Sequence, residues 1–100
     1  MQLEFHYDPE TDIATIRVLG KNPVDSEHFE NEGFVIDYDE NDNIIALEIF
    51  DWNKREDLSD IISVLTKETF DLGKRNYIPD IVSDLAKYKK IVNNFSLLTH

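Results

Sequence analysis

Apolar and polar residues alternate along the first half of the chain, and this alternation predicts β-strands. Residues 3–7 and 34–38 show the period of two that is typical of a half-buried strand. β-Branched residues dominate 13–18, and alternation returns over 44–50. Short polar turns join the strands of each pair, with Pro9 in the first turn. Two such hairpins predict a four-stranded antiparallel meander, because parallel strands would need long crossovers.

The last predicted strand carries apolar residues on both of its faces. Leu47 and its neighbours at steps of two lie on one face, and Phe50 and Trp52 extend the other. Residues 19–31, between the two hairpins, are expected as a loose acidic connection. A sheet this small is not stable with both faces in water. We therefore expect the second half of the chain, a second copy or a partner to cover it.

The second half shows the spacing of amphipathic helices. Asp57 is a suitable N-cap, an apolar stripe runs from Leu58 to Leu72, and Gly73 is suited to the C-terminal cap. Pro79 fits the first turn of a second helix. The apolar positions of that helix recur at steps of three and four residues: Ile78, Ile81, Leu85, Tyr88, Val92 and Phe95.

These patterns together predict an α+β fold, in which the meander is followed by two C-terminal amphipathic helices. Residues 1–55 form the expected acidic β domain. Residues 56–100 form a helical extension that is expected to pack on the sheet or on a partner.

Charge divides the chain at the same place as the predicted structure. The first 53 residues contain 14 acidic residues and two basic ones, Arg17 and Lys21, whereas the remaining residues contain seven acidic and eight basic ones. The net charge of −11 repels nucleic acid and anionic membranes. It favours a basic partner, or the imitation of a polyanion.

The start of the sequence and its composition bear on the cellular location and on the chemistry that we expect. Met1 is followed by neither the basic nor the apolar segment of a signal peptide. No apolar run approaches the ~20 residues of a membrane span. The absence of cysteine excludes disulfides, thiolate metal sites and cysteine nucleophiles. We expect a cytoplasmic protein that does not contact the membrane.

Several turn and strand motifs in the first half resemble a known family. The segments are 7–12 (YDPETD), 16–18 (IRV), 33–40 (GFVIDYDE), 43–49 (NIIALEI) and 53–55 (NKR). Together they are similar to the small prokaryotic family of unknown function DUF2283.

The resemblance covers about Leu3 to Arg55, and it implies a compact antiparallel β domain without an established activity. The family's association with small operons that include toxin–antitoxin pairs implies a role of that kind. Two features depart from the family: Asp42 stands where such a turn often carries glycine, and residues 56–100 have no counterpart in its short members.

An acidic turn near the middle of the chain resembles a calcium-binding loop. Asp37, Asp39 and Asn41 match the first, third and fifth positions of an EF-hand loop, and Glu48 matches the twelfth. Asp42, however, occupies the sixth position, where the sharp turn requires glycine. The flanking segments also have the pattern of strands. We interpret the segment as an acidic hairpin turn and expect neither a metal nor a cofactor.

Other polar residues do not form a recognisable catalytic set. His6, Asp8 and Asp12 bracket the first turn, but no second histidine is near them in sequence. The serines of the predicted helices have no base placed by a motif, and three isolated glycines cannot form a phosphate-binding loop. We therefore expect a protein that is not an enzyme and does not bind nucleic acid directly.

The preferred interpretation is an antitoxin-like inhibitor that holds a basic RNase-type partner, a toxin encoded nearby. An acidic face would steer the partner, and exposed apolar residues would anchor it. The expected acidic face consists of Asp37, Asp39, Glu40 and Asp42. The expected anchors are Phe50, Trp52, Ile81, Leu85, Tyr88 and Phe95. Phe50 and Trp52 fit equally well beneath the first helix.

Two other functions fit the same charge. An acidic decoy that imitates nucleic acid to block a nuclease would need acids spaced like phosphates along one surface. A self-associating scaffold would pair the helical seams of two copies. A homodimer is compatible with each of these interpretations.

Overall fold

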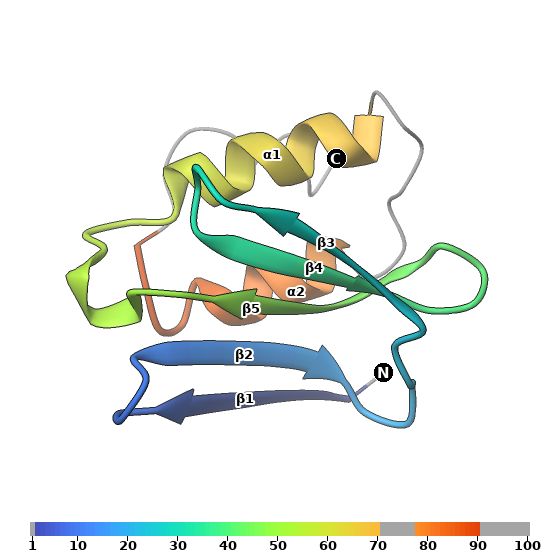
Figure 1. Cartoon of the computed structure of the whole chain (residues 1–100), viewed down its shortest axis with the longest axis horizontal. Coiled ribbons are helices and arrows are strands. Elements are labelled where there is room, and N and C mark those ends of the chain that lie inside the picture. The colour runs from blue at the N-terminus through green and yellow to red at the C-terminus, as the bar shows by residue number, and fades with distance from the viewer. Residues whose placement is uncertain (1, 71–77, 91–100) are drawn as a thin grey trace.

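Five antiparallel strands form one sheet, and two helices pack against it (Figure 1). The computed structural model describes residues 2–70 and 78–90. Its elements are β1 (Leu3–Asp8), β2 (Ile13–Val18), β3 (Asp25–Phe29), β4 (Phe34–Tyr38), β5 (Ile44–Ile49), a 3₁₀ turn (Trp52–Lys54), α1 (Ser59–Phe70) and α2 (Ile78–Leu85). The predicted α+β class is confirmed. The four expected antiparallel strands correspond to β1, β2, β4 and β5. Neither described helix is long and apolar enough to cross a membrane.

The prediction of four strands was wrong by one strand. β3 lies within the segment expected as a loose connection, and it pairs with β4 from Asp25 opposite Tyr38 to Phe29 opposite Phe34. Its sequence, DSEHF, has one large apolar residue and no β-branched residue. This composition suits an edge strand, because charged side chains there hinder pairing with other chains. The same composition removes the hydrophobic alternation by which strands are recognised.

The strand order also differs from a plain meander. The order is β1-β2-β5-β4-β3, so that β2 pairs with β5 and not with the next strand in sequence. This is a Greek-key order, and it requires residues 19–24 to cross from β2 to the far edge of the sheet. The crossing spans three strand spacings, about 14 Å. Six extended residues reach roughly 20 Å, so the short segment suffices.

The hydrophobic core lies between one face of the sheet and the two helices. α2 lies behind the sheet in the view of Figure 1. Alternate residues of the central strands point to this side, and the apolar stripes of both helices meet them. The core consists of Ala14, Ile16, Phe34, Ile36, Tyr38, Ile44, Leu47, Ile49, Trp52, Leu58, Ile61, Ile62, Leu65, Ile81, Val82 and Leu85.

The helix boundaries confirm the predicted start of α1 and correct the predicted length of α2. The Asp57 carboxylate accepts hydrogen bonds from the backbone N and the hydroxyl of Ser59, as a cap should. α2 ends at Leu85 instead of continuing through the predicted seam. The chain then turns, and the Lys90 carbonyl accepts a hydrogen bond from the backbone N of Leu58 at 3.0 Å. The predicted positions Leu72, Gly73, Val92 and Phe95 lie outside the described residues.

Arg55 ties three parts of the fold together. Its guanidinium donates to the carbonyl oxygens of Phe50 at 2.8 Å, Glu32 at 2.6 Å and Gly33 at 2.8 Å. It also forms an ion pair with Asp60 of α1 at 3.2 Å. The Arg55 side chain is 12% exposed. It therefore fixes the β3–β4 turn to the end of β5 and to the first turn of α1.

A second network joins the β1–β2 turn to the 3₁₀ turn. The Asp12 carboxylate accepts hydrogen bonds from the Tyr7 hydroxyl at 2.8 Å and from the backbone N of Asn53 at 3.0 Å. The Asn53 amide donates to the Tyr7 oxygen at 2.6 Å, and the Asp12 carbonyl accepts from the backbone N of Trp52. The hydrogen bond from Asn53 and that from Tyr7 hold the pKa of Asp12 below its ordinary value. Tyr7, Asp12 and Asn53, which lie in the sequence motifs 7–12 and 53–55, therefore stabilise the fold.

Candidate functional site: the helix-free face of the sheet

The face of the sheet opposite the core carries mostly polar residues, and neither of the two described helices covers it. Because side chains alternate along a strand, every second residue of each strand points to this side. We call it the helix-free face. Its side chains are Glu4, His6, Thr15, Arg17, Ser26, His28, Val35, Asp37, Ala46, Glu48 and Phe50.

A small hollow opens on the helix-free face beside the crossing segment 19–24. It has a volume of about 150 Å³. It is lined by Thr15, Arg17, Lys21, Pro23, Asp37, Ile45, Ala46 and Glu48. Ile45 and Ala46 are buried at its floor, although neither α1 nor α2 covers them. The crossing segment therefore shields part of this face from water.

Two carboxyl groups meet at this hollow. Asp37 on β4 and Glu48 on β5 are diagonal neighbours, because Asp37 lies opposite Ala46 and Val35 lies opposite Glu48. The Ser26 hydroxyl donates to Asp37 at 2.6 Å. Burial, together with a hydrogen bond and repulsion from Asp37, raises the pKa of Glu48, while His28 opposes the shift.

A second hollow lies at the opposite end of the helix-free face. Its volume is about 240 Å³. Phe50 is half-buried there. The rings of Phe29 and Phe34, whose centroids are 4.9 Å apart, lie on the core side of the sheet, because Phe29 is opposite Phe34 and Phe34 is a core residue. We call it the Phe50 hollow, and it is lined by His28, Phe29, Glu30, Gly33, Phe34 and Phe50.

The structure separates the four residues of the predicted acidic face. Asp37 and Asp39 are buried, whereas Glu40 and Asp42 are exposed. Asp39 stabilises its own turn by accepting hydrogen bonds from the backbone N of Asn43 and of Asn41, each at 2.9 Å. Burial works to raise the pKa of Asp39, but these hydrogen bonds outweigh it and hold the pKa below its ordinary value. Two of the four side chains are therefore presented to solvent.

The residues of the weak calcium-binding candidate are also separated in the structure. Asp37 and Glu48 belong to the sheet face, while Asp39 is engaged within its turn. Asp42 adopts a φ of 62°, so an aspartate occupies the left-handed conformation for which an EF-hand uses glycine. Within residues 2–70 and 78–90, no three acidic or histidine side chains are placed to hold a metal ion.

Three of the six predicted apolar anchors lie inside the protein. Ile81, Leu85 and Trp52 belong to the core. Phe50 lies on the helix-free face, and Phe95 is outside the described residues.

Tyr88 is 51% exposed, and one side of its ring stacks on Phe5 at 4.0 Å. Nearby, the Lys89 ammonium lies 5.0 Å from the centre of the Trp52 ring. Phe50 and Tyr88 are thus the predicted anchors that retain surface among those the structure describes.

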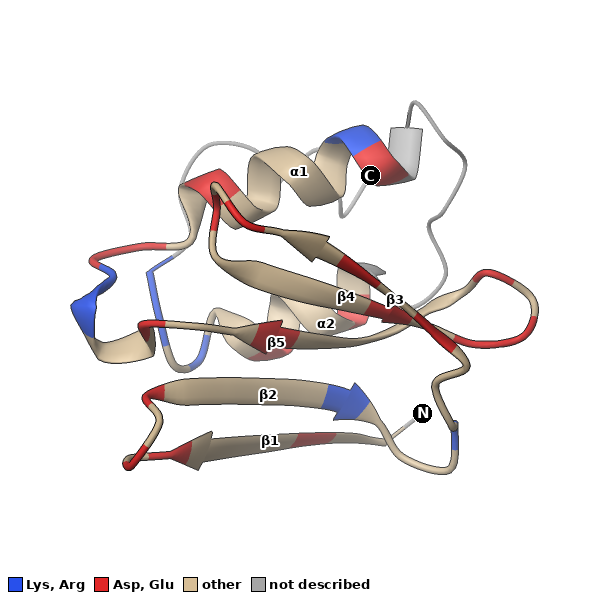
Figure 2. Cartoon of the chain, in the orientation of Figure 1, with Lys and Arg blue, Asp and Glu red and all other residues tan. Residues whose placement is uncertain are grey.

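Acidic residues gather on the turns at both ends of the sheet (Figure 2). The β1–β2 and β3–β4 turns share one end with Phe50, and the β4–β5 turn lies at the other. Glu10, Glu30 and Asp51 are exposed at the Phe50 end, and Glu40 and Asp42 at the opposite end. The negative surface is therefore wider than the hairpin turn singled out from the sequence.

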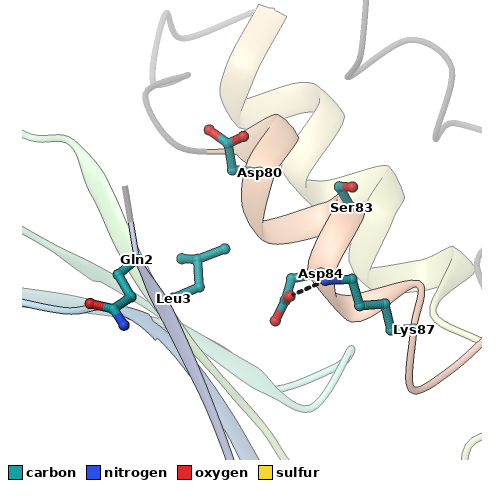
Figure 3. Close-up of a pocket in the computed structure, with 6 residues that line it drawn as sticks. All are labelled: Gln2, Leu3, Asp80, Ser83, Asp84 and Lys87. Carbon is teal, nitrogen blue, oxygen red and sulfur yellow. Dashed lines mark hydrogen bonds and ion pairs between the residues drawn. The ribbon is translucent and has the colours of Figure 1, made fainter.

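A further, shallow hollow lies between β1 and α2 (Figure 3). Its volume is about 410 Å³, and polar side chains dominate its lining. The residues around it are Gln2, Leu3, Asp80, Ser83, Asp84 and Lys87. Lys87 and Asp84 form an ion pair at 3.1 Å, so the cation of this hollow is already engaged.

Sequence reasoning did not single out His28 and Glu30, which border the Phe50 hollow. Both lie in the segment expected as a connection, so no strand register was available to place them. For the neighbouring strand, the sequence did indicate which residues share a face. The alternation over residues 44–50 puts Ala46, Glu48 and Phe50 on one face, opposite the core residues Leu47 and Ile49.

Comparison with known proteins agrees with the motifs noted in the sequence. No curated protein and no solved structure matches the chain. Residues 4–52 match the model of a family, and they include nearly the whole sheet and the start of the 3₁₀ turn. The matched family is described as Protein of unknown function (DUF2283).

Proposed function

We propose that this protein is a non-catalytic binding module that holds a basic protein partner, and that it acts as an antitoxin-like inhibitor of an RNase-type toxin. The observation that carries the proposal is the exposed negative charge at both ends of the sheet. The family match covers the same part of the chain, so this charge lies on the matched β domain and not on the helical extension.

Internal ion pairs cannot neutralise this charge. The first 53 residues contain 14 acidic residues but only Arg17 and Lys21 as bases. Arg17 already pairs with Glu4 at 3.2 Å, and Lys54 from the next segment pairs with Asp51 at 3.6 Å. Uncompensated charge of one sign accelerates encounter with an oppositely charged protein and selects against like-charged ones. A basic partner therefore fits this surface.

An RNase-type toxin supplies such a partner, because an enzyme that binds RNA presents basic residues to its phosphates. A bound acidic protein would occupy that basic surface and exclude RNA. The nucleic-acid decoy fits less well, since the acids lie on separate turns at two ends of the sheet and not along one line. The toxin–antitoxin role that the resemblance to this family implies is consistent with the same choice.

Co-expression with the product of the neighbouring reading frame tests the proposal. We expect the two proteins to co-purify, and the neighbour to arrest growth when it is expressed alone. Co-expression should restore growth. A neighbour that is harmless alone and does not co-purify would contradict the proposed function.

A further inference from the structure

The structure also offers a specific site at which a basic partner would bind. Resting on the proposed function, we propose that an arginine side chain of the partner inserts into the Phe50 hollow on the helix-free face, stacks on the Phe50 ring and pairs with Glu30. The observations behind this are the shape of the hollow, its charge and its rigid walls.

The shape of the hollow suits one long side chain. Its volume of about 240 Å³ is roughly eight times the ~30 Å³ share of one water in the liquid. The Phe50 ring supplies an apolar surface, while His28 and Glu30 stand at the polar rim. An arginine combines an apolar stem with a charged planar head, and so it matches both parts.

The charge of the hollow selects a cation. Glu30 is exposed at the rim, and Glu10 and Asp51 are exposed at the same end of the sheet. A guanidinium can stack on an aromatic face and pair with a carboxylate through two parallel hydrogen bonds, which an ammonium cannot. The arrangement therefore favours arginine over lysine.

The walls of the hollow are fixed before any partner binds. Arg55 donates to the carbonyl oxygens of Gly33 and Phe50, each at 2.8 Å. The backbone N of Phe50 also donates to the Gly33 carbonyl at 3.0 Å. Preorganised walls lower the entropy cost of binding. The hollow does not depend on the partner for its shape.

A second copy of this chain is a poorer occupant. Each copy carries a net charge of −11, so two copies repel one another. The exposed acids that surround the Phe50 end of the sheet would be brought together in such a dimer. Charge complementarity thus favours a basic partner over self-association.

Titration of the isotope-labelled protein with a nona-arginine peptide, followed by NMR, tests the inference. We expect the largest shifts at the backbone amides of Glu30, Gly33 and Phe50. Nona-lysine, a probe of equal charge, should bind at least about twofold more weakly. Glu30→Gln should weaken nona-arginine binding roughly threefold.

Glu40→Gln is the matched control, because Glu40 is also an exposed glutamate in a turn but lies at the opposite end of the sheet. It should leave the affinity nearly unchanged. Phe50→Leu keeps an apolar side chain and removes the ring, and should also weaken binding about threefold. The amide spectra of the variants verify that each one is folded.

Three results would overturn the inference. If the shifts centre on Glu40 and Asp42, and Glu40→Gln weakens binding more than Glu30→Gln, the arginine site is elsewhere while the proposed function stands. If nona-lysine binds as tightly as nona-arginine and neither Glu30→Gln nor Phe50→Leu matters, the hollow plays no part. If neither peptide binds, the electrostatic basis of the proposed function fails as well.

Discussion

The guanidinium of Arg55 lies where a side chain on Gly33 would be. A Cβ added to Gly33 would come within 2.7 Å of Arg55 Nη2, and the same nitrogen donates to the Gly33 carbonyl at 2.8 Å. Gly33 also has a φ of +75°, which disfavours any residue with a side chain. The two residues are separated by 22 positions in sequence, and their contact shapes the Phe50 hollow.

Replacing Arg55 with lysine should destabilise the protein. Lysine cannot reproduce the fork that reaches the three carbonyl oxygens and Asp60 together. We expect Arg55→Lys to lower the free energy of unfolding by about 2 kcal/mol, since hydrogen bonds from a charged group contribute about 1.5–3 kcal/mol each. Urea unfolding measures the loss.

Arg17→Lys is the control for that substitution. The Arg17 side chain is 52% exposed and makes a single ion pair, with Glu4. We expect it to change the free energy of unfolding by no more than about 0.5 kcal/mol. Equal losses in the two variants would show that Arg55 does not clamp the fold.

Gly33→Ala should be more harmful than Gly20→Ala. Both glycines have positive φ, +75° and +82°, so both substitutions introduce backbone strain of about 1 kcal/mol or more. Only Gly33 has a fixed neighbour in the way, because nothing lies within 4 Å of a Cβ at Gly20. The difference between the two unfolding free energies therefore isolates the contact with Arg55. No difference would contradict the packing described here.

The contact between Gly33 and Arg55 could not be predicted from the sequence, although most of the strands could. The alternation of apolar residues located β1, β2, β4 and β5, because each has one face in the core. It could not locate β3, whose residues Asp25–Phe29 are mostly polar, as is common at an edge. Without β3, residues that border the hollow, such as His28, could not be placed.

For the second helix, the sequence pattern predicted a longer element than the structure has. Its spacing of apolar residues continues past Leu85, and on periodicity alone the helix continues too. Tertiary contacts decide otherwise, since the chain turns at Tyr88 and the Lys90 carbonyl pairs with the backbone of Leu58. Likewise, Trp52 and Phe50 look alike in sequence, but one lies in the core and the other on the helix-free face.

Glu48→Gln should stabilise the protein at alkaline pH more than at acid pH. The pKa of Glu48 is raised in the folded state, by burial and then by Asp37. Protonation of Glu48 thus contributes stability that is complete below the pKa of the unfolded chain and is lost as pH rises through the raised folded pKa. Glutamine imitates the protonated form at every pH. Thermal melts across pH should show a rise of a few degrees above that window and little change below it.

Glu40→Gln provides the comparison for this effect, because it makes the same chemical change at an exposed turn. Its effect on the melting temperature should not grow with pH in the same way. If Glu48→Gln lowers the melting temperature at alkaline pH, or if the two variants behave alike, the carboxyl pair with Asp37 is not a source of repulsion.

The salt dependence of partner binding tests the central claim, which is that exposed acid on the sheet recruits a basic protein. Calorimetry of the complex with the product of the neighbouring reading frame should be done at about 0.1 M and about 1 M salt, where the Debye length falls from roughly 10 Å to roughly 3 Å. We predict that the Kd rises about tenfold or more, equivalent to ~1.4 kcal/mol. A Kd that is unchanged or smaller at high salt would contradict the account.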